Sequence, residues 1–580
     1  MLNQKYIRVL TIDLTSQTFD IEERADLYEY LGGSGVAVQL FSETVNPNLD
    51  AYAPAQPIVF AIGPLSTIYP AVTKTVAMFR SPLTGELGES HAGLRSALAM
   101  RFAGYDAIVI RGRAARATYL SIGSRSVDFK NAEPLWGLST EEAGRLLREL
   151  EPGMGQRSCL RIGPAGEKLV AFAGVNVDTF RHFGRLGLGA VFGSKNLKAI
   201  VIYGKNSYPI SKFKEYAQVY QEIYTQMIDT ELMEKYHDLG TSVNVAPLSA
   251  MHALPTRNLQ QSSFEQAEQI SGESFAAEAL IRKMACPGCP VGCIHIGICR
   301  RQFAGDGFEW ESATVSYDHE LIYALGSMLG VGDKNDLLAL IEKVELHGLD
   351  AISTGVLLAW VTEAYTRGLI TEQEVGGPVA FGETAHYLEV IDRLVTQPNE
   401  FYQVLARGTA AAAERYGGQE FALTLGKNEV AGYHTGYANI LGQLVGARHS
   451  HLDNAGYSLD QTLTEYNPEK IVSALIEEEQ IRCALTSLCI CLFARKVYDP
   501  PTVIKALGAI GIDLTEEQFI KLGKKIWRLK LAVKRRLGYD ETQLNIPKRF
   551  FETPGLKGQL NEQTMEELRR LYREKIRMVL

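Results

Sequence analysis

The sequence predicts an α+β protein in which a β-rich N-terminal domain is followed by two mainly helical domains. Short β-type runs separated by Gly, Pro, Ser and Asn turns fill the first 205 residues, and helical periodicity replaces them afterwards. The length of 580 residues is also enough for about three or four domains. We expect domains at 1–205, 206–417 and 418–580, with the last boundary where a helix ends on Gly417 and Gly418.

The predicted elements follow from these two patterns in chain order. Strands are expected at 7–14, 57–62, 75–79, 105–111, 117–122, 169–175 and 197–203. Helices are expected at 211–235, 333–346, 353–367, 401–416 and 468–484. No internal repeat or low-complexity segment interrupts them, which argues against a solenoid or a disordered tail.

Composition excludes several classes of function. The formal charge is -8 and no block of like charges is long enough to grip a phosphate backbone, so nucleic acid is not an expected partner. The most basic stretch, 524–536, is interleaved with apolar residues and predicts an amphipathic helix with a solvated face; the alternative is a docking surface for an acidic partner. The N-terminus lacks a signal-peptide pattern and no apolar run is long enough to cross a membrane, so we expect a cytoplasmic protein.

Three of the eight cysteines form the sharpest local motif, Cys286-Pro-Gly-Cys289-Pro-Val-Gly-Cys293. Pro and Gly prevent a regular helix, so this C-x2-C-x3-C loop can wrap around a metal centre. A 4Fe-4S cluster needs four thiolates, so a distant fourth cysteine is expected. The alternatives are a zinc ribbon or inert buried thiols, although zinc would need a second paired knuckle. The candidates for the fourth ligand are Cys159, Cys299, Cys483, Cys489 and Cys491.

Several further segments, in the same order along the chain, make the sequence resemble the aldehyde ferredoxin oxidoreductase family. They are residues 80–106, GPAGEKLVAFAGVNVD, residues 184–200, the cysteine motif, HELIYALGSMLGV, ELHGLDAISTG, GARHSHLDNAGYS, TSLCIC and LNIPKRFFETP. The resemblance covers nearly the whole chain.

The resemblance implies one tungsten held between two molybdopterins, with a 4Fe-4S cluster beside it, at the junction of the three domains. Magnesium bridging the pterin phosphates belongs to the same picture, and molybdenum in place of tungsten stays open. The implied pterin contacts are Lys74, His91, Gly93, Arg185, Leu186, Gly187, Glu345, Gly348, Leu349, Asp350, Asp453, Thr486 and Ile490. Glycine-rich turns suit such a site because backbone N–H groups can approach phosphate oxygens where no Cβ intervenes. Such glycines can equally make tight β turns.

This sequence departs from the family pattern at the second pterin motif, D-x-x-G-L-C. The leading Asp is Thr486 and the Gly is Cys489. The resemblance makes the last residue, Cys491, the fourth cluster ligand, with Cys489 as its rival. In the first motif the leading Asp is Glu345, which keeps a carboxylate. Asp453 stands where relatives commonly carry Lys, and this charge reversal favours altered pterin and substrate surroundings.

Two residues match the acid–base groups of the family's active site. Aldehyde oxidation removes two electrons and two protons, so a group that takes a proton is required. The resemblance assigns this chemistry to Glu320 and His451, with His449 and Asp318 as alternatives. The residues alone favour a carboxylate at a helix N-terminus and a hydrogen-bonded buried histidine.

The favoured function is oxidation of an aldehyde with water to a carboxylic acid, with electrons leaving through the cluster to ferredoxin or a ferredoxin-like subunit. One alternative is a catalytic subunit of a larger complex that reduces an activated acid or an aromatic thioester. Another is a degenerate electron-transfer subunit that has lost the pterins. A homo-oligomer is also compatible with the sequence.

Overall fold

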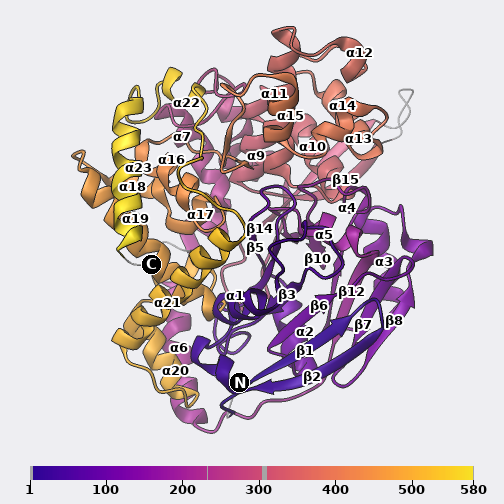
Figure 1. Cartoon of the computed structure of the whole chain (residues 1–580), viewed down its shortest axis with the longest axis vertical. Coiled ribbons are helices and arrows are strands. Elements are labelled where there is room, and N and C mark those ends of the chain that lie inside the picture. Colours follow the sequence, from indigo (N-terminus) through magenta and orange to yellow (C-terminus); the bar gives the residue numbers. More distant parts are fainter. Residues whose placement is uncertain (1–3, 231–232, 303–309, 579–580) are drawn as a thin grey trace.

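The β-rich N-terminal region and the mainly helical remainder appear as predicted, and the fold class is confirmed (Figure 1). The computed structural model describes residues 4–230, 233–302 and 310–578. Within these ranges no helix is long and apolar enough to cross a membrane.

Two six-stranded mixed sheets form the N-terminal region. The first has the order β2 (Thr18–Arg24), β1 (Ile7–Asp13), β6 (Ala107–Arg111), β3 (Ile58–Ala61), β4 (Thr75–Arg80) and β5 (Leu87–Ala92). The second has the order β11 (Arg181–Phe183), β10 (Val175–Val177), β9 (Arg157–Arg161), β12 (Leu197–Tyr203), β7 (Thr118–Ile122) and β8 (Val127–Asn131). One apolar core joins them, with the rings of Phe60 and Phe183 5.5 Å apart. Helix α2 (Ser96–Ala103) lies in the same core.

Six of the seven predicted strand runs contain a strand, and the run at 169–175 is the exception. Only Val175 of that run belongs to a strand, β10. Residues 170–174 form a buried loop, in which the Ala171 N–H donates to the Ala406 carbonyl and Ala173 forms an isolated bridge with Leu349. The run is apolar because it is buried between the N-terminal region and the helices.

The predicted helices are present with two changes. Three correspond to α10 (Lys334–His347), α11 (Ala351–Thr366) and α19 (Pro468–Ser487). The helix predicted at 211–235 is α6 (Phe213–Ile228) followed by a π-helix (Met233–Leu239), and Glu231 and Leu232 lie outside the described residues. The helix predicted at 401–416 is two helices, α14 (Glu400–Leu405) and α15 (Thr409–Tyr416), because Gly408 between them takes a φ of 99°.

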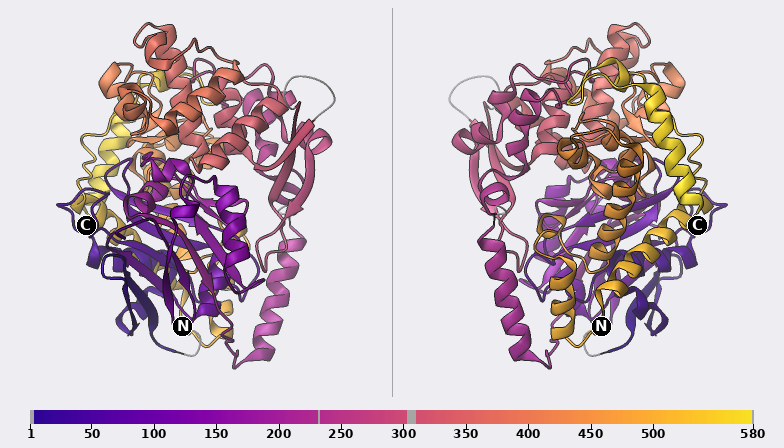
Figure 2. Two further views of the ribbon diagram at one scale, coloured as in Figure 1. Left: turned by 90° about the vertical axis from the view of Figure 1, so that its right-hand side faces the viewer. Right: turned by 90° about the vertical axis from the view of Figure 1, so that its left-hand side faces the viewer.

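A three-stranded sheet inside the helical part was not predicted. It comprises β13 (Leu280–Met284), β14 (Ile294–Gln302) and β15 (Trp310–Tyr317), and Figure 2 shows it along one side of the molecule, above α6. The cysteine motif forms the loop between β13 and β14. This sheet therefore holds the cysteine loop against the N-terminal region.

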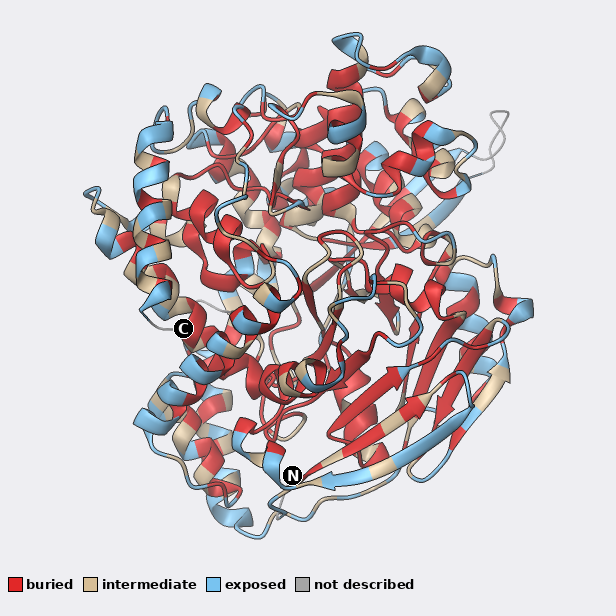
Figure 3. Ribbon diagram, in the orientation of Figure 1, coloured by how far each residue is buried: buried red, intermediate tan, exposed pale blue. Residues whose placement is uncertain are grey.

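The C-terminal helices pack against the first sheet through α1 (Gly33–Thr44), which contacts β3, β4, α19 and α21 (Glu516–Arg536). Buried residues run continuously from the sheets into these helices (Figure 3). The basic stretch does form an amphipathic helix, but Trp527, Lys530 and Lys534 are buried. The Lys530 ammonium lies 2.7 Å from a Glu89 carboxylate oxygen, so part of the predicted basic face binds β5 instead of solvent.

Candidate functional site

The three cysteines of the loop lie together against the N-terminal region. The Leu94 N–H donates to Cys286 Sγ at 3.2 Å, and the Cys289 N–H donates to the Cys286 carbonyl at 3.0 Å. Burial raises the pKa of the Cys289 thiol to about 12, and the neighbouring charges of Cys491, Cys293 and Cys286 raise it in the same direction. The loop therefore aims three thiols into one electrostatic environment.

Cys491 joins this group, whereas Cys489 does not. Ala71 connects the two cysteine segments: its N–H donates to the Gly288 carbonyl at 3.4 Å, and its carbonyl accepts from the Cys491 N–H at 3.0 Å. Cys489 takes a left-handed φ of 62°, which turns its thiol toward the Ala61 carbonyl at 3.9 Å. Of the two rivals, Cys491 is the one beside the triplet.

The remaining cysteines lie on other elements. Cys299 donates to the Asn335 carbonyl at 3.7 Å, Cys483 is buried on α19 near Lys530, and Cys159 is buried on β9. In the described part of the chain, no three His, Cys, Asp or Glu side chains converge tightly enough to hold a single metal ion.

Cationic side chains and a glycine surround the thiols. A Cβ on Gly93 would lie 2.8 Å from Cys286 Sγ, so only glycine permits this approach. The same Cβ position is 3.5 Å from the Lys74 ammonium nitrogen. Among the described residues the Lys74 ammonium forms no ion pair or hydrogen bond. Lys74 is therefore available to a negatively charged group beside the thiols.

Arg185 provides a second anchoring point for an anion. Its Nε donates to Asp350 Oδ2 at 3.1 Å, and one terminal nitrogen donates to the Glu429 carbonyl at 2.7 Å and to Asn428 Oδ1 at 2.9 Å. The other terminal nitrogen is buried and has no protein partner among the described residues. Asp350 caps α11 by accepting from the Ile352 N–H. The guanidinium is thus held rigidly with one donor unused.

The glycines of the 184–193 segment serve chain packing. Gly187 has a φ of 87°, and a Cβ there would lie 2.0 Å from the Ala171 carbonyl oxygen. Leu186 before it is buried and also left-handed, and its carbonyl accepts from the Ser81 hydroxyl at 2.8 Å. The close approach at Gly187 is to the protein backbone, which agrees with the tight-turn reading of these glycines.

The first pterin-like motif, which runs from Glu345 to Asp350, lies against the buried loop that contains Ala171 and Ala173. Glu345 Oε2 lies 2.8 Å from His182 Nε2, so its carboxylate is paired with strand β11. The Gly348 carbonyl accepts from the Gly174 N–H at 2.9 Å, and Leu349 forms the bridge with Ala173. The structure therefore brings this motif together with Arg185.

The second motif is arranged differently. The Thr486 hydroxyl lies 2.8 Å from the Ser34 hydroxyl at the start of α1. Ile490 is buried, and its N–H donates to the Leu485 carbonyl at 3.2 Å. Thr486 offers no carboxylate, and its hydroxyl is hydrogen-bonded to Ser34 and to the Arg482 carbonyl.

Asp453 belongs to a buried ion pair, and His91 belongs to a hydrogen-bonded pair with a buried carboxylate. Asp453 Oδ1 lies 2.5 Å from Arg448 Nε, which neutralises the carboxylate. His91 Nε2 lies 2.7 Å from Glu89 Oε1. Burial lowers the pKa of His91 to about 4. Glu89 is the carboxylate that also binds Lys530.

Glu320 and His451 are brought into contact from separate helices. Glu320 lies in the first turn of α9 (His319–Leu325) and His451 begins α17 (His451–Asn454). Glu320 Oε1 lies 3.4 Å from His451 Nε2 and accepts from the Tyr433 hydroxyl at 3.1 Å. His451 Nδ1 is buried with no partner in the described residues. The pair can therefore accept or hold a proton at either side chain.

The pKa values of two neighbouring carboxyl groups, Glu320 and Asp318, are shifted in opposite directions. Burial is the largest influence and would raise the pKa of Glu320, but the hydrogen bond to His451 and the charges of His319 and His451 together outweigh it and lower the pKa to about 2. Burial, and next the Glu320 charge, raise the pKa of Asp318 to about 6. Groups whose environments push their pKa values apart are typical of acid–base sites.

His449 lies in another environment. Its Nε2 is 3.1 Å from Glu86 Oε2, its Nδ1 lies 3.2 Å from the Gln443 carbonyl, and its ring packs on Gly426. It therefore does not compete with His451 for Glu320. Sequence reasoning missed Tyr433 and His182, whose aromatic or imidazole type in an apolar surrounding carried no distinguishing signal.

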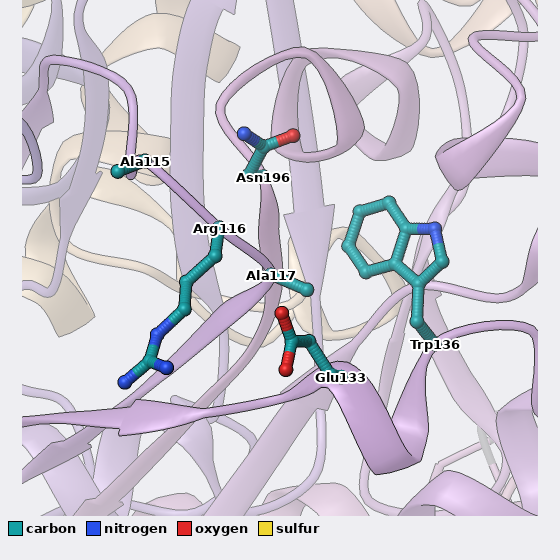
Figure 4. A pocket seen from close by; sticks show the side chains of 6 residues that line it. All are labelled: Ala115, Arg116, Ala117, Glu133, Trp136 and Asn196. Atoms are coloured by element: carbon teal, nitrogen blue, oxygen red, sulfur yellow. The ribbon is translucent and has the colours of Figure 1, made fainter.

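An open depression of about 610 Å³ on the β-rich region is separate from these residues. It is lined by Ala115, Arg116, Ala117, Glu133, Trp136 and Asn196 (Figure 4). None of the predicted site residues lines it.

Comparisons with known proteins show what the whole chain is similar to. Residues 9–204 match the family described as aldehyde ferredoxin oxidoreductase, N-terminal domain, and residues 218–576 match domains 2 and 3 of the same family. The tungsten-containing aldehyde ferredoxin oxidoreductase of Pyrococcus furiosus is 30% identical over 568 residues, covering 94% of this chain and 91% of the relative. The relative from Thermococcus kodakarensis is also 30% identical, with the same coverage.

Two more distant proteins are also similar. An aliphatic sulfonate oxidoreductase, WOR-like subunit, from Pyrococcus furiosus is 27% identical and covers 90% of this chain and 85% of the relative. Among solved structures, the BamBC active-site complex of benzoyl coenzyme A reductase aligns with a TM-score of 0.84 at 20% identity, covering 98% of this chain and 94% of that chain. At that identity the likeness concerns the fold.

Proposed function

This chain belongs to the aldehyde ferredoxin oxidoreductase family, and from that premise we propose that it oxidises an aldehyde with water to a carboxylic acid. Membership makes it an oxidoreductase related to enzymes that use a tungsten or molybdenum pterin. The proposed cofactors are tungsten bis-molybdopterin and a 4Fe-4S cluster on Cys286, Cys289, Cys293 and Cys491. The single observation that carries the reaction is the contact between Glu320 and His451.

The side chains present fit a pterin phosphate. One buried Arg185 donor is unused and the half-buried Lys74 ammonium is unpaired among the described residues, so both can bind an anion. Charge-assisted hydrogen bonds to phosphate would satisfy both. Arg185 and Lys74 are therefore the proposed anchors, with His91, Gly93, Glu345 and Asp350 in their surroundings.

The thiols fit a cluster better than a single zinc ion. Zinc holds sulfur at about 2.3 Å, which places four sulfurs about 3.8 Å from one another. The described residues contain no group gathered that tightly. A 4Fe-4S cluster binds each thiolate through a separate iron, so its four sulfur ligands lie farther apart than those of a single zinc ion.

The bound tungsten centre would take two electrons from the substrate, and the cluster would pass them to ferredoxin or a ferredoxin-like subunit. Oxidation of an aldehyde by water releases two protons along with the two electrons. The Glu320 carboxylate is held ionised and can accept the first proton, while Tyr433 donates to the same oxygen and fixes its position. His451 Nε2, 3.4 Å from the same oxygen, holds the carboxylate in place, while the buried His451 Nδ1 has no partner among the described residues and can hold a proton.

The proposal is tested with protein purified without oxygen from cells supplied with tungstate. We expect about four irons and one tungsten per chain, and reduction of benzyl viologen that depends on an added aldehyde. Protein that contains iron but neither tungsten nor molybdenum would favour the electron-transfer subunit instead. Full metal content without aldehyde oxidation would favour the second candidate.

That second candidate is a catalytic subunit of a larger complex acting on another oxidised substrate. It is favoured by the Asp453–Arg448 pair, which changes the charge where relatives commonly carry Lys. The sulfonate relative and the benzoyl coenzyme A reductase complex are similar proteins with such other substrates. Copurification of a partner subunit, with dye-dependent reduction of a thioester, would support it.

A further inference from the structure

Arg181 lies between the cysteine loop and the acid–base residues. It belongs to β11, and one terminal nitrogen lies 3.9 Å from Cys293 Sγ while the other donates to the Phe180 carbonyl at 3.3 Å. Its Cγ is 3.9 Å from the position that a Cβ on Gly93 would take. Within the described residues Arg181 forms no ion pair with a carboxylate. Among the described residues, the Cys293 thiol is therefore the acidic side chain in contact with this half-buried guanidinium.

The electrostatic surroundings of Arg181 agree with this placement. Burial opposes its charge, but the sulfurs of Cys293 and Cys286, followed by Asp318, outweigh burial and raise the pKa of Arg181. The Arg181 charge also lowers the pKa of Asp318, against burial and the Glu320 charge, which raise it. One cation thus acts on both the proposed cluster and the acid–base pocket.

A fixed cation has a definite effect on a cluster. Four thiolate ligands leave a 4Fe-4S cluster negatively charged, and reduction adds one more negative charge. Nearby positive charge and hydrogen bonds to the sulfurs therefore favour the reduced state. Arginine is suited to this role because it stays protonated and donates from several nitrogens.

We propose that Arg181 is a positioning residue that raises the reduction potential of the cluster through its contact with Cys293. The inference rests on the cluster of the proposed function. It adds a residue that neither the cysteine motif nor the pterin contacts include. His182, the next residue on β11, pairs with Glu345 of the first pterin-like motif. This pair holds strand β11, and with it Arg181, against that motif.

The test uses the complete protein purified without oxygen, with Arg181→Gln, Arg181→Lys and a matched control. The control is Arg148→Gln, which removes a guanidinium that donates to the Asp178 carbonyl at 3.3 Å and, among the described residues, forms no hydrogen bond to a proposed cluster cysteine. The EPR signal of the reduced cluster is followed during a redox titration, and iron content is measured on the same samples.

In Arg181→Gln we expect the ratio of reduced to oxidised cluster at the wild-type midpoint to fall about tenfold, a shift of about 59 mV for one electron. In Arg181→Lys this ratio should fall less, and in Arg148→Gln it should equal that of the wild type. Loss of iron in Arg181→Gln alone would also support the charge role, since Lys keeps the charge. Iron-loaded Arg181→Gln with an unchanged midpoint, or iron loss in both variants, would refute it. Iron-free wild-type protein would instead refute the proposed function.

Discussion

Glu320 Oε1 and His451 Nε2 lie 3.4 Å apart, although the two residues come from different helices and distant parts of the sequence. The Asp318 side chain caps the start of α9, the helix that carries Glu320. The Ser450 side chain caps the start of α17, the helix that begins with His451. Both residues therefore sit at helix starts, where their side chains project away from the regular hydrogen bonding of the helix. The two helix caps therefore help to place the Glu320 carboxylate and the His451 imidazole next to each other.

We expect Glu320→Gln and His451→Ala each to lower aldehyde oxidation by about 100- to 10,000-fold, the usual contribution of a positioned acid–base group. Gln keeps the shape of Glu but cannot accept the proton. Tungsten and iron content, measured on the same protein, should not change. Turnover is measured with benzyl viologen at saturating aldehyde.

The control for this prediction is His449→Gln. His449 is bonded to Glu86 and not to Glu320, so this variant should lose thermal stability while its folded fraction keeps wild-type turnover. Near-normal turnover in both Glu320→Gln and His451→Ala would show that the acid–base assignment is wrong, and Asp318→Asn would be tested next.

The sequence predicted six of the twelve described strands of the β-rich region, because short β-type runs that end at turn residues mark them. It did not predict the sheet containing β13, β14 and β15, whose strands carry exposed charged residues such as Arg300 and Arg301. It misread 169–175 as a strand because a loop buried between domains is as apolar as a strand. An apolar run in the sequence indicates that a segment is buried. Whether the buried segment is a strand or a loop depends on its tertiary contacts.

The candidate site shows the same limit. The motif spacing located the cysteine triplet but could not orient Cys489, since the left-handed φ at that residue turns the thiol away. The alternation of 524–536 predicted an amphipathic helix, yet Lys530 and Lys534 are covered because Glu89 and Glu86 approach from β5 and the turn before it. Long-range pairing of charges leaves no local signal.

Gly187→Ala should destabilise the fold before it affects cofactor binding. The added Cβ would meet the Ala171 carbonyl oxygen at 2.0 Å, so the backbone must shift. We expect a loss of about 2 to 5 kcal/mol in the free energy of unfolding, as for strained or overpacked sites. Thermal unfolding of protein prepared without tungstate measures this directly.

Gly155→Ala is the matched control because Gly155 has a similar φ of 83° with nothing within 4 Å of a Cβ. It should lose only the conformational part, about 1 kcal/mol. Equal losses in the two variants would mean that backbone strain, and not the contact with Ala171, requires glycine at 187.

Glu479 should make stability depend on pH. Burial, and next the Asp453 charge, raise the pKa of Glu479 to about 7, above its unfolded value of about 4.3. The folded state therefore holds a proton that the unfolded state releases between about pH 4 and 7. The free energy of unfolding contributed by Glu479 falls as pH rises through that window and is constant above it.

Glu479→Gln should remove this slope, because Gln stays neutral and can still accept from the Ala447 N–H. We expect Gln to be more stable than wild type at pH 8 by about 1 to 3 kcal/mol, with the difference vanishing near pH 4. Urea unfolding at a series of pH values measures both slopes. Parallel slopes for the two proteins would exclude Glu479 as their source.

Cys491→Ser and Cys489→Ser should separate the two candidates for the fourth cluster ligand. The Cys491 N–H donates to the carbonyl of Ala71, the residue that binds the cysteine loop, whereas the Cys489 thiol faces the Ala61 carbonyl. Ser keeps the size of Cys but is a poor ligand for iron, so Cys491→Ser should lose most of its iron and sulfide. Cys489→Ser should retain about four irons per chain and the EPR signal of the reduced cluster. Equal iron content in both variants would move the fourth ligand elsewhere, and a larger loss in Cys489→Ser would reverse the assignment.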